Sequence, residues 1–173
     1  RMAEENCKML RFIIPAYNEE KNIDLLVENT GRFAELRGCE YQIIIINDGS
    51  TDNTMILLRD LQKKYPIVIL DQVVNKGVGE AFKRGIRYAA EVTSDEDIVI
   101  TKEADNTSDL SILEAMIKKI EEGYSLVLAS CYMPGGGVYS TSVYRRILSS
   151  GANSLLKIIA PIKGIHTFSS FYR

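Results

Sequence analysis

The chain has 173 residues, 46% of them hydrophobic, and its 21 Lys and Arg residues nearly balance its 23 Asp and Glu residues. This length favours one domain with one substantial core, which we expect to span residues 1–173. A net charge of -2 provides no basic surface of the kind that neutralises a phosphate backbone, so we expect no nucleic-acid partner.

The cysteines and the chain ends bear on location. Cys7, Cys39 and Cys131 are far apart and form no Cys-x-x-Cys pair, which argues against a disulfide framework or a zinc site and favours a cytosol-facing protein. No apolar run approaches the roughly 20 residues that cross a bilayer, and the first residues lack the apolar core of a signal peptide. We therefore expect a soluble chain. Residues 167–173 show no obvious domain end, which predicts a domain that is incomplete at its C-terminus.

Short apolar runs alternate with segments of helical spacing along the chain. The runs are rich in Ile and Val and nearly continuous, which is typical of strands covered on both faces of a parallel sheet. They span residues 10–15, 42–46, 67–70, 98–101 and 125–129. A strand and a helix follow each other about every 25 to 30 residues, as in repeated βαβ units. The sequence therefore predicts an α/β fold with a mostly parallel, Rossmann-like sheet and helices on both faces.

Each predicted helix carries an apolar stripe. The stripes are Ile23, Leu26, Val27, Thr30 and Ala34; Leu57, Leu58 and Leu61; Phe82, Ile86 and Ala89; and Leu113, Met116, Ile117 and Ile120. Asp52 or Thr54 is predicted to start the second helix, and Ser108 or Asp109 the fourth. Beyond Met133, residues 134–137 predict a turn or loop, and residues 142–159 predict a further helix.

Polar residues cluster directly after the first four predicted strands. Ligands of open parallel sheets bind outside the carboxyl ends of the strands, so these clusters predict the binding site. They are Pro15 to Glu20, Asn47 to Asp52, Asn75 to Gly79, and Glu103 to Asp105. The Gly-x-Gly of the third cluster does not predict a dinucleotide site, because Phe82 stands at the third glycine position and the cluster follows the third strand.

Together these clusters resemble the family-2 glycosyltransferases of GT-A fold, from about Phe12 to the last residue. Within that family the likeness is nearest to dolichol-phosphate mannosyltransferases and related polyprenyl-phosphate glycosyltransferases. The narrower resemblance rests on four features: Ser130-Cys131-Tyr132; Gly135-Gly136-Gly137; Arg145 with Ser149, Gly151, Ala152 and Asn153; and Ser170-Phe171-Tyr172-Arg173. It implies a single catalytic domain that binds a nucleotide-sugar donor.

Glu103 and Asp105 are the candidate metal ligands. Two residues apart at a strand end, their carboxylates project to one side and can share Mg²⁺ or Mn²⁺, which would neutralise a diphosphate leaving group. The alternative is an exposed acidic turn that caps the next helix. The family pattern is Asp-x-Asp, and Glu103 departs from it, so Asp105 is the safer ligand and is also a catalytic candidate.

The resemblance also implies the nucleotide-binding residues. Asp48 corresponds to an aspartate that accepts a hydrogen bond from a ring N–H of uracil or guanine, although Asn47 to Ser50 could simply form a turn. Tyr17 and Glu19 would flank the base and ribose. The remaining candidates are Pro15 and Ala16 at the floor, Lys76 near the base or phosphate, and Ala104 between the two acids.

Arg145 and Arg173 are the candidates for gripping phosphate, because a guanidinium binds phosphate bidentately; the alternative for Arg145, beside Arg146, is a solvated helix face. His166 is more simply structural, and it stands where relatives carry an aspartate.

The function that we expect is inverting transfer of a sugar from GDP-mannose or a UDP-sugar to a polyprenyl phosphate. The acceptor oxygen is already anionic, so no strong base is required. A lipid acceptor implies the cytoplasmic side of a membrane, where residues 155–165 would lie in the interface or form a buried helix. Two alternatives stay open: transfer to a saccharide or protein hydroxyl, and a catalytically weak nucleotide-sugar binder. The donor's base and sugar and the identity of the acceptor stay open, and no oligomeric state is predicted.

Overall fold

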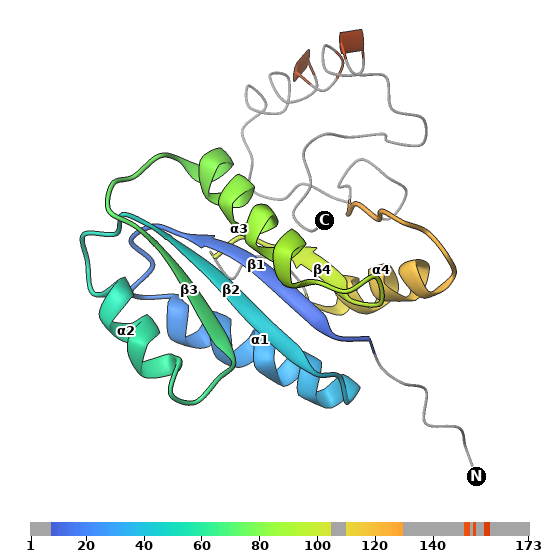
Figure 1. Cartoon of the computed structure of the whole chain (residues 1–173), viewed down its shortest axis with the longest axis horizontal. Coiled ribbons are helices and arrows are strands. Elements are labelled where there is room, and N and C mark those ends of the chain that lie inside the picture. The colour runs from blue at the N-terminus through green and yellow to red at the C-terminus, as the bar shows by residue number, and fades with distance from the viewer. Residues whose placement is uncertain (1–7, 105–109, 130–150, 153, 155–157, 160–173) are drawn as a thin grey trace. The chain divides into compact units, whose positions relative to one another are not determined.

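The computed structural model describes residues 8–104, 110–129, 151–152, 154 and 158–159 (Figure 1). The chain forms two compact units, residues 1–111 and residues 112–173; that these units make one catalytic domain stays a prediction. None of the helices in the described ranges is both long enough and apolar enough to span a bilayer.

The first unit is built on a four-stranded sheet. Its elements in chain order are β1 (Leu10–Ala16), α1 (Ile23–Arg37), β2 (Tyr41–Asp48), α2 (Thr54–Leu61), β3 (Ile67–Gln72), α3 (Val78–Val92) and β4 (Ile98–Thr101). The strand order is β3-β2-β1-β4, and every pairing is parallel. The predicted α/β fold is therefore confirmed. Because the chain adds β2 and β3 on one side of β1 and β4 on the other, the connections reverse direction beside β1, where such sheets bind ligands.

Helices cover both faces of this sheet, with α3 on one face and α1 and α2 on the other (Figure 1). All members of the predicted α1 stripe are buried, and so is Leu58 of the α2 stripe. Helix α2 begins at Thr54, and its N-cap residue is Asn53. The N–H of Thr54 donates to Asp52 Oδ1 at 3.0 Å, so the helix starts where the sequence predicted, although neither Asp52 nor Thr54 is the N-cap residue.

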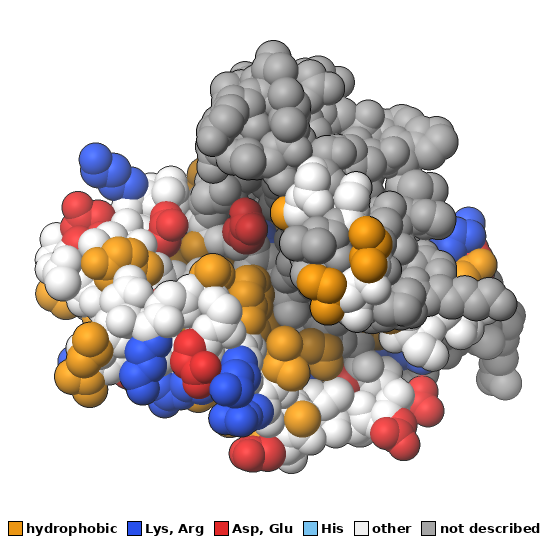
Figure 2. All heavy atoms as spheres, turned by 90° about the horizontal axis from the view of Figure 1, so that it is seen from above, with side chains coloured by type: hydrophobic (Ala, Val, Ile, Leu, Met, Phe, Trp, Pro, Cys, Tyr) orange, Lys and Arg blue, Asp and Glu red, His pale blue; other side chains and the backbone are white. Residues whose placement is uncertain are grey.

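Helix α3 approaches the sheet through small residues, which confirms Ala89 of the predicted stripe and corrects Ile86. Ala81, Gly85 and Ala89 are buried, whereas Ile86 is 51% exposed. A Cβ at Gly85 would lie 2.5 Å from Ile13 Cγ2 and 2.7 Å from Ile46 Cδ1, so the helix backbone rests directly on the isoleucines of the sheet. On the α3 face, exposed hydrophobic side chains are interspersed with charged side chains of both signs (Figure 2).

Two further predictions are corrected. Residues 125–129 are not a strand: the segment is irregular, and Leu126 is 58% exposed. An apolar run becomes a strand only where a neighbouring strand supplies hydrogen bonds, and the run itself does not specify that neighbour. Cys39 is disulfide-bonded, contrary to the expectation of no disulfide.

The second unit contains most of α4 (Ser111–Glu121), in which Leu113, Met116 and Ile117 are buried, in agreement with the predicted stripe. The predicted start at Ser108 or Asp109, the loop at 134–137 and most of the helix at 142–159 lie outside the described residues.

Candidate active site

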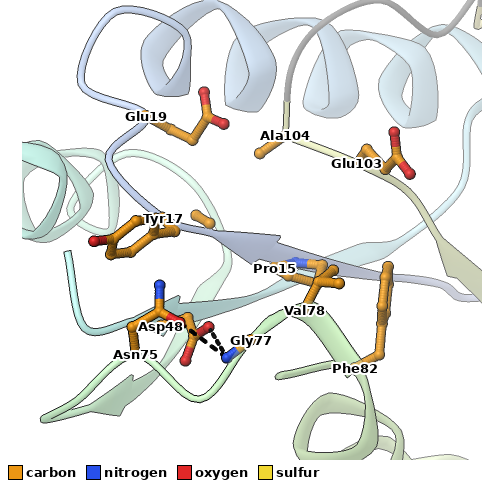
Figure 3. A pocket seen from close by; sticks show the side chains of 11 residues that line it. Pro15, Tyr17, Glu19, Asp48, Asn75, Gly77, Val78, Phe82, Glu103 and Ala104 are labelled. Atoms are coloured by element: carbon orange, nitrogen blue, oxygen red, sulfur yellow. Dashed lines mark hydrogen bonds between the residues drawn. The ribbon is translucent and has the colours of Figure 1, made fainter. Parts of the chain in front are cut away.

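A pocket of about 330 Å³ lies where the carboxyl ends of the strands meet the start of α3 (Figure 3). The last residue of β2 and the loops that follow β1, β3 and β4 all contribute to it, as the parallel topology requires. Its described lining residues are Pro15, Ala16, Tyr17, Glu19, Asp48, Asn75, Gly77, Val78, Phe82, Glu103 and Ala104.

Most of the residues that the sequence nominated meet in this pocket. The nominated residues in the lining come from three of the four strand ends and include Asp48 and Glu103, which are far apart in the sequence. The nominated residues in the lining are Pro15, Ala16, Tyr17, Glu19, Asp48, Glu103 and Ala104. Asp105, Arg145 and Arg173 lie outside the described residues, as does His166.

Asp48 is the most constrained acid of the pocket. It is the last residue of β2 and only 3% exposed. Its Oδ1 accepts the backbone N–H of Lys76 and its Oδ2 accepts the backbone N–H of Gly77, each at 2.8 Å; Figure 3 shows the carboxylate turned toward this loop. Each carboxylate oxygen has two lone-pair sites, so Asp48 holds the loop between β3 and α3 and still keeps acceptor capacity.

The glycine after Asp48 packs against the same loop. Gly49 has φ +71°, and a Cβ there would lie 2.5 Å from Asn75 N and 2.7 Å from Val74 C. A side chain at this position would therefore meet backbone atoms, and its backbone conformation would also be strained. Asp48 and Gly49 thus hold residues 74–77 in place by hydrogen bonds and close packing, and the pair is more than a turn.

Four lining residues were not singled out as nucleotide or metal ligands, although three of them fall in a cluster that was predicted to form the site. Asn75, Gly77 and Val78 belong to the cluster after β3, and Phe82 lies one helical turn beyond Val78 on α3. The i, i+4 spacing of Val78 and Phe82 was a usable signal, but only the direction in which α3 leaves the sheet decides that this face meets the pocket. The exposed side chain of Lys76 does not appear among the described lining residues; its backbone N–H is what contacts Asp48.

The loop after β1 supplies Tyr17 and Glu19. Tyr17 is 46% exposed, and Glu19 Oε2 accepts Nδ2 of Asn22 at 2.7 Å. Between these two residues, Asn18 adopts a left-handed conformation with φ +56°, which Asn tolerates better than most residues. This conformation changes the direction of the chain, so that neighbouring side chains of one short loop both reach the pocket.

The described lining is acidic. It contains the carboxylates of Glu19, Asp48 and Glu103, and no lysine or arginine belongs to this part of the lining. Such a surface repels a pyrophosphate unless a cation intervenes. Within the described ranges, no three His, Cys, Asp or Glu residues are arranged to hold a metal ion, and the second predicted ligand, Asp105, lies outside these ranges.

The model of a family described as "Glycosyl transferase family 2" matches residues 12–171. Two relatives are a dolichol-phosphate mannosyltransferase of Pyrococcus furiosus, 30% identical over 86% of this chain and 40% of that protein, and a polyprenol monophosphomannose synthase of Mycolicibacterium smegmatis, 26% identical over 93% and 59%. A third is a dolichyl-phosphate beta-glucosyltransferase of Trichomonas vaginalis, 30% identical over 89% and 48%. The chain thus spans about half the length of these relatives.

Among solved structures, glucosyl-3-phosphoglycerate synthase from Mycobacterium tuberculosis, in complex with Mn²⁺, UDP and phosphoglyceric acid, has a TM-score of 0.60 and 24% identity over 95% of this chain and 55% of that one. The likeness agrees with the GT-A fold expected from the sequence. With the family model matched along nearly its whole length, the chain belongs to glycosyl transferase family 2.

Proposed function

We propose that the protein transfers a sugar from a nucleotide-diphosphate sugar to the phosphate of a polyprenyl lipid. The observation that carries this proposal is the convergence of Asp48 and Glu103 in one pocket at the carboxyl edge of the sheet. Nucleotide-sugar chemistry needs one group that recognises the base and others that manage the charge of the diphosphate, and these two acids come from strands on either side of β1.

The base and ribose occupy the part of the pocket between Tyr17 and Asp48 in this proposal. Asp48 accepts a ring N–H with the lone pairs that its two loop contacts leave available. The half-exposed ring of Tyr17 provides a flat apolar surface for the base, and Glu19 accepts a ribose hydroxyl. Pro15 and Ala16 end β1 and form the floor.

A divalent cation, Mg²⁺ or Mn²⁺, is proposed at the Glu103 end. The chemistry of the donor set fits, because such ions bind through one or two carboxylates together with phosphate oxygens and the described lining is acidic. Glu103 would hold the ion together with Asp105. When bound, the ion supplies charge neutralisation for the diphosphate leaving group.

The acceptor is proposed to be a lipid phosphate, as the names of the relatives from Pyrococcus, Trichomonas and Mycolicibacterium suggest. An acceptor phosphate oxygen attacks the anomeric carbon from the face opposite the diphosphate, so the new glycosidic bond forms as the old one breaks and the configuration inverts. The oxygen is already anionic, so the pocket positions it and removes no proton. Arg145 and Arg173 are proposed to bind phosphate, and the reaction is placed at the cytoplasmic side of a membrane.

Calorimetry on the full-length protein tests the donor part. UDP-sugars and GDP-sugars are titrated with and without Mn²⁺, into the wild type, Glu103→Gln and the control Glu91→Gln, whose side chain is exposed on α3. We expect Mn²⁺-dependent binding that Glu103→Gln weakens about tenfold and Glu91→Gln leaves unchanged. Failure of every nucleotide to bind would refute the proposal.

Transfer assays test the acceptor. The donor that binds is incubated with a polyprenyl phosphate, with 3-phosphoglycerate and with a free saccharide, and the products are separated. We expect a sugar-phosphate linkage on the lipid alone. Transfer to the saccharide would favour the hydroxyl acceptor instead, and binding without any transfer would favour a nucleotide-sugar binder.

A further inference from the structure

The loops after β1 and β2 are joined by a reciprocal set of hydrogen bonds beside the pocket. Backbone N–H groups of the first loop donate to side chains of the second: Asn18 to Ser50 Oγ at 3.0 Å, Glu19 to Thr54 Oγ1 at 2.8 Å, and Glu20 to Asp52 Oδ2 at 3.1 Å. In return, the N–H of Thr51 donates to Asn18 Oδ1 at 2.8 Å, and that of Asn53 to Glu20 Oε2 at 3.2 Å. We call these five contacts the loop clasp.

Asp52 and Thr54 lie at the centre of the loop clasp. The Thr54 hydroxyl donates to Asp52 Oδ1 at 2.6 Å, so its lone pairs are directed toward the N–H of Glu19. The other oxygen of Asp52 accepts the N–H of Glu20. Thr54 is fully buried, so water cannot replace its hydroxyl as the partner of Glu19. Two consecutive amides of the β1 loop thus depend on one carboxylate, one of them through Thr54.

We infer that Asp52 and Thr54 are positioning residues for nucleotide binding: they fix the backbone at Glu19 and Glu20 and thereby hold the side chains of Tyr17 and Glu19 in the pocket. Neither Asp52 nor Thr54 lines the pocket, so any effect on a ligand passes through the loop. The inference rests on the proposed function, because it assigns Tyr17 and Glu19 to nucleotide binding.

The chemistry predicts which substitutions disturb the hydrogen bonds from Glu19 and Glu20 to Thr54 and Asp52, which we call the relay. Thr54→Val keeps the shape but removes the only oxygen that faces the Glu19 N–H, and an unsatisfied buried donor is costly. Thr54→Ser keeps the hydroxyl. Asp52→Asn replaces one carboxylate oxygen with an NH₂ group, which in either orientation faces a donor, from Thr54 or from Glu20. Asp60→Asn removes the same charge farther along α2, where Asp60 pairs with exposed Lys63.

Calorimetry of UDP and GDP with Mn²⁺, on the full-length protein, separates positioning from general damage. A purely structural defect lowers the fraction of competent sites and leaves Kd unchanged, whereas a misplaced loop raises Kd at full stoichiometry. We expect Kd to rise about tenfold in Thr54→Val and Asp52→Asn, and to stay within about threefold of wild type in Thr54→Ser and Asp60→Asn.

Unchanged Kd in both Asp52→Asn and Thr54→Val would overturn the inference, whatever their stability. If Thr54→Val does not fold, Asp52→Asn against Asp60→Asn decides the question by the same measurement. A wild-type protein that binds neither nucleotide gives a different result: it overturns the proposed function itself, and the relay with it.

Discussion

The two loop systems that border the pocket are held in different ways. The loops after β1 and β2 are joined by the five reciprocal contacts of the loop clasp. The loop between β3 and α3 is held to β2 by Asp48, through two N–H contacts, and by the close packing of Gly49. In that loop Val73 is 95% exposed and Val74 is 64% exposed, so side-chain burial adds little there.

This difference gives Asp48 two roles. In the proposed function it recognises the base, and in the structure it also builds one wall of the pocket. The affinity of a ligand that donates to the same carboxylate therefore depends on the position of residues 76 and 77. The wall formed by the loops after β1 and β2, in contrast, is held by several side chains of the loop clasp. The loss of one of these side chains should therefore not abolish binding.

The largest effect is expected from Asp48→Asn. The introduced NH₂ group must face the N–H of Lys76 or of Gly77, and the base loses an acceptor at the same time. With two hydrogen-bonding defects of about 1 to 3 kcal/mol each, nucleotide affinity should fall by about 100-fold, as measured by calorimetry. Faster hydrogen exchange at residues 76 and 77, with residues 18–20 unchanged, would show that only one wall is loosened; equal loosening of both walls would contradict the comparison.

The packing of Gly49 is tested against another glycine of similar conformation. Gly38 has φ +72° and nothing within 4 Å of a built Cβ, whereas Gly49 has φ +71° and backbone atoms at 2.5 and 2.7 Å. Gly38→Ala should cost about 1 kcal/mol of unfolding free energy for its backbone conformation, and Gly49→Ala about 3 kcal/mol, because the contact adds to that cost. Urea denaturation measures both. Equal costs would mean that the loop moves away freely.

The sequence predicted the site residues that strand topology brings together better than those that the packing of a helix brings into the pocket. Pro15 ends one apolar run, and Asp48 and Glu103 closely follow two others. Parallel strands bring their carboxyl ends to one edge, so the meeting of these residues needed only the right fold. Val78 and Phe82 enter the pocket because α3 leaves its loop in one particular direction. Nothing in the local pattern specifies that direction.

The face of α3 shows the same limit. Hydrophobic periodicity selected Phe82, Ile86 and Ala89, yet of these only Ala89 is among the buried residues of α3, which also include Ala81 and Gly85. How closely a helix approaches a sheet is decided by tertiary packing, and a close approach favours small residues. The sequence likewise did not predict the loop clasp. Its contacts join positions more than 30 residues apart, and these positions pair only once the fold brings the two loops together.

The clasped wall should respond to acid. Partial burial favours a raised pKa for Asp52, but the hydrogen bonds from Thr54 and Glu20 outweigh it and lower the pKa below the ordinary value of 3.8. A lowered folded-state pKa means that this carboxylate stabilises the fold above the unfolded-state pKa, and that the contribution is lost as pH falls through the folded value. Unfolding free energy should therefore fall less between pH 5 and about pH 3 in Asp52→Asn than in wild type, as urea denaturation at each pH would measure.

If the unfolding free energy of Asp52→Asn falls with pH as steeply as that of wild type, the loop clasp does not depend on this charge. Asp60→Asn is the control, because Asp60 is fully exposed and solvent screens its pair with Lys63.

The smallest effect is expected from Lys76→Ala, which distinguishes the two ways in which this residue can serve the site. If its ammonium group binds base or phosphate, as the sequence resemblance implies, nucleotide affinity should fall about tenfold or more. The structure places the side chain in solvent and uses the backbone N–H, which alanine retains, to hold Asp48 at 2.8 Å. We therefore expect UDP and GDP affinity to change by less than about threefold, far below the effect of Asp48→Asn. Calorimetry on the two variants side by side measures this change. If Lys76→Ala loses nearly as much nucleotide affinity as Asp48→Asn, the lysine side chain itself binds the nucleotide, and its charge contributes to this side of the pocket.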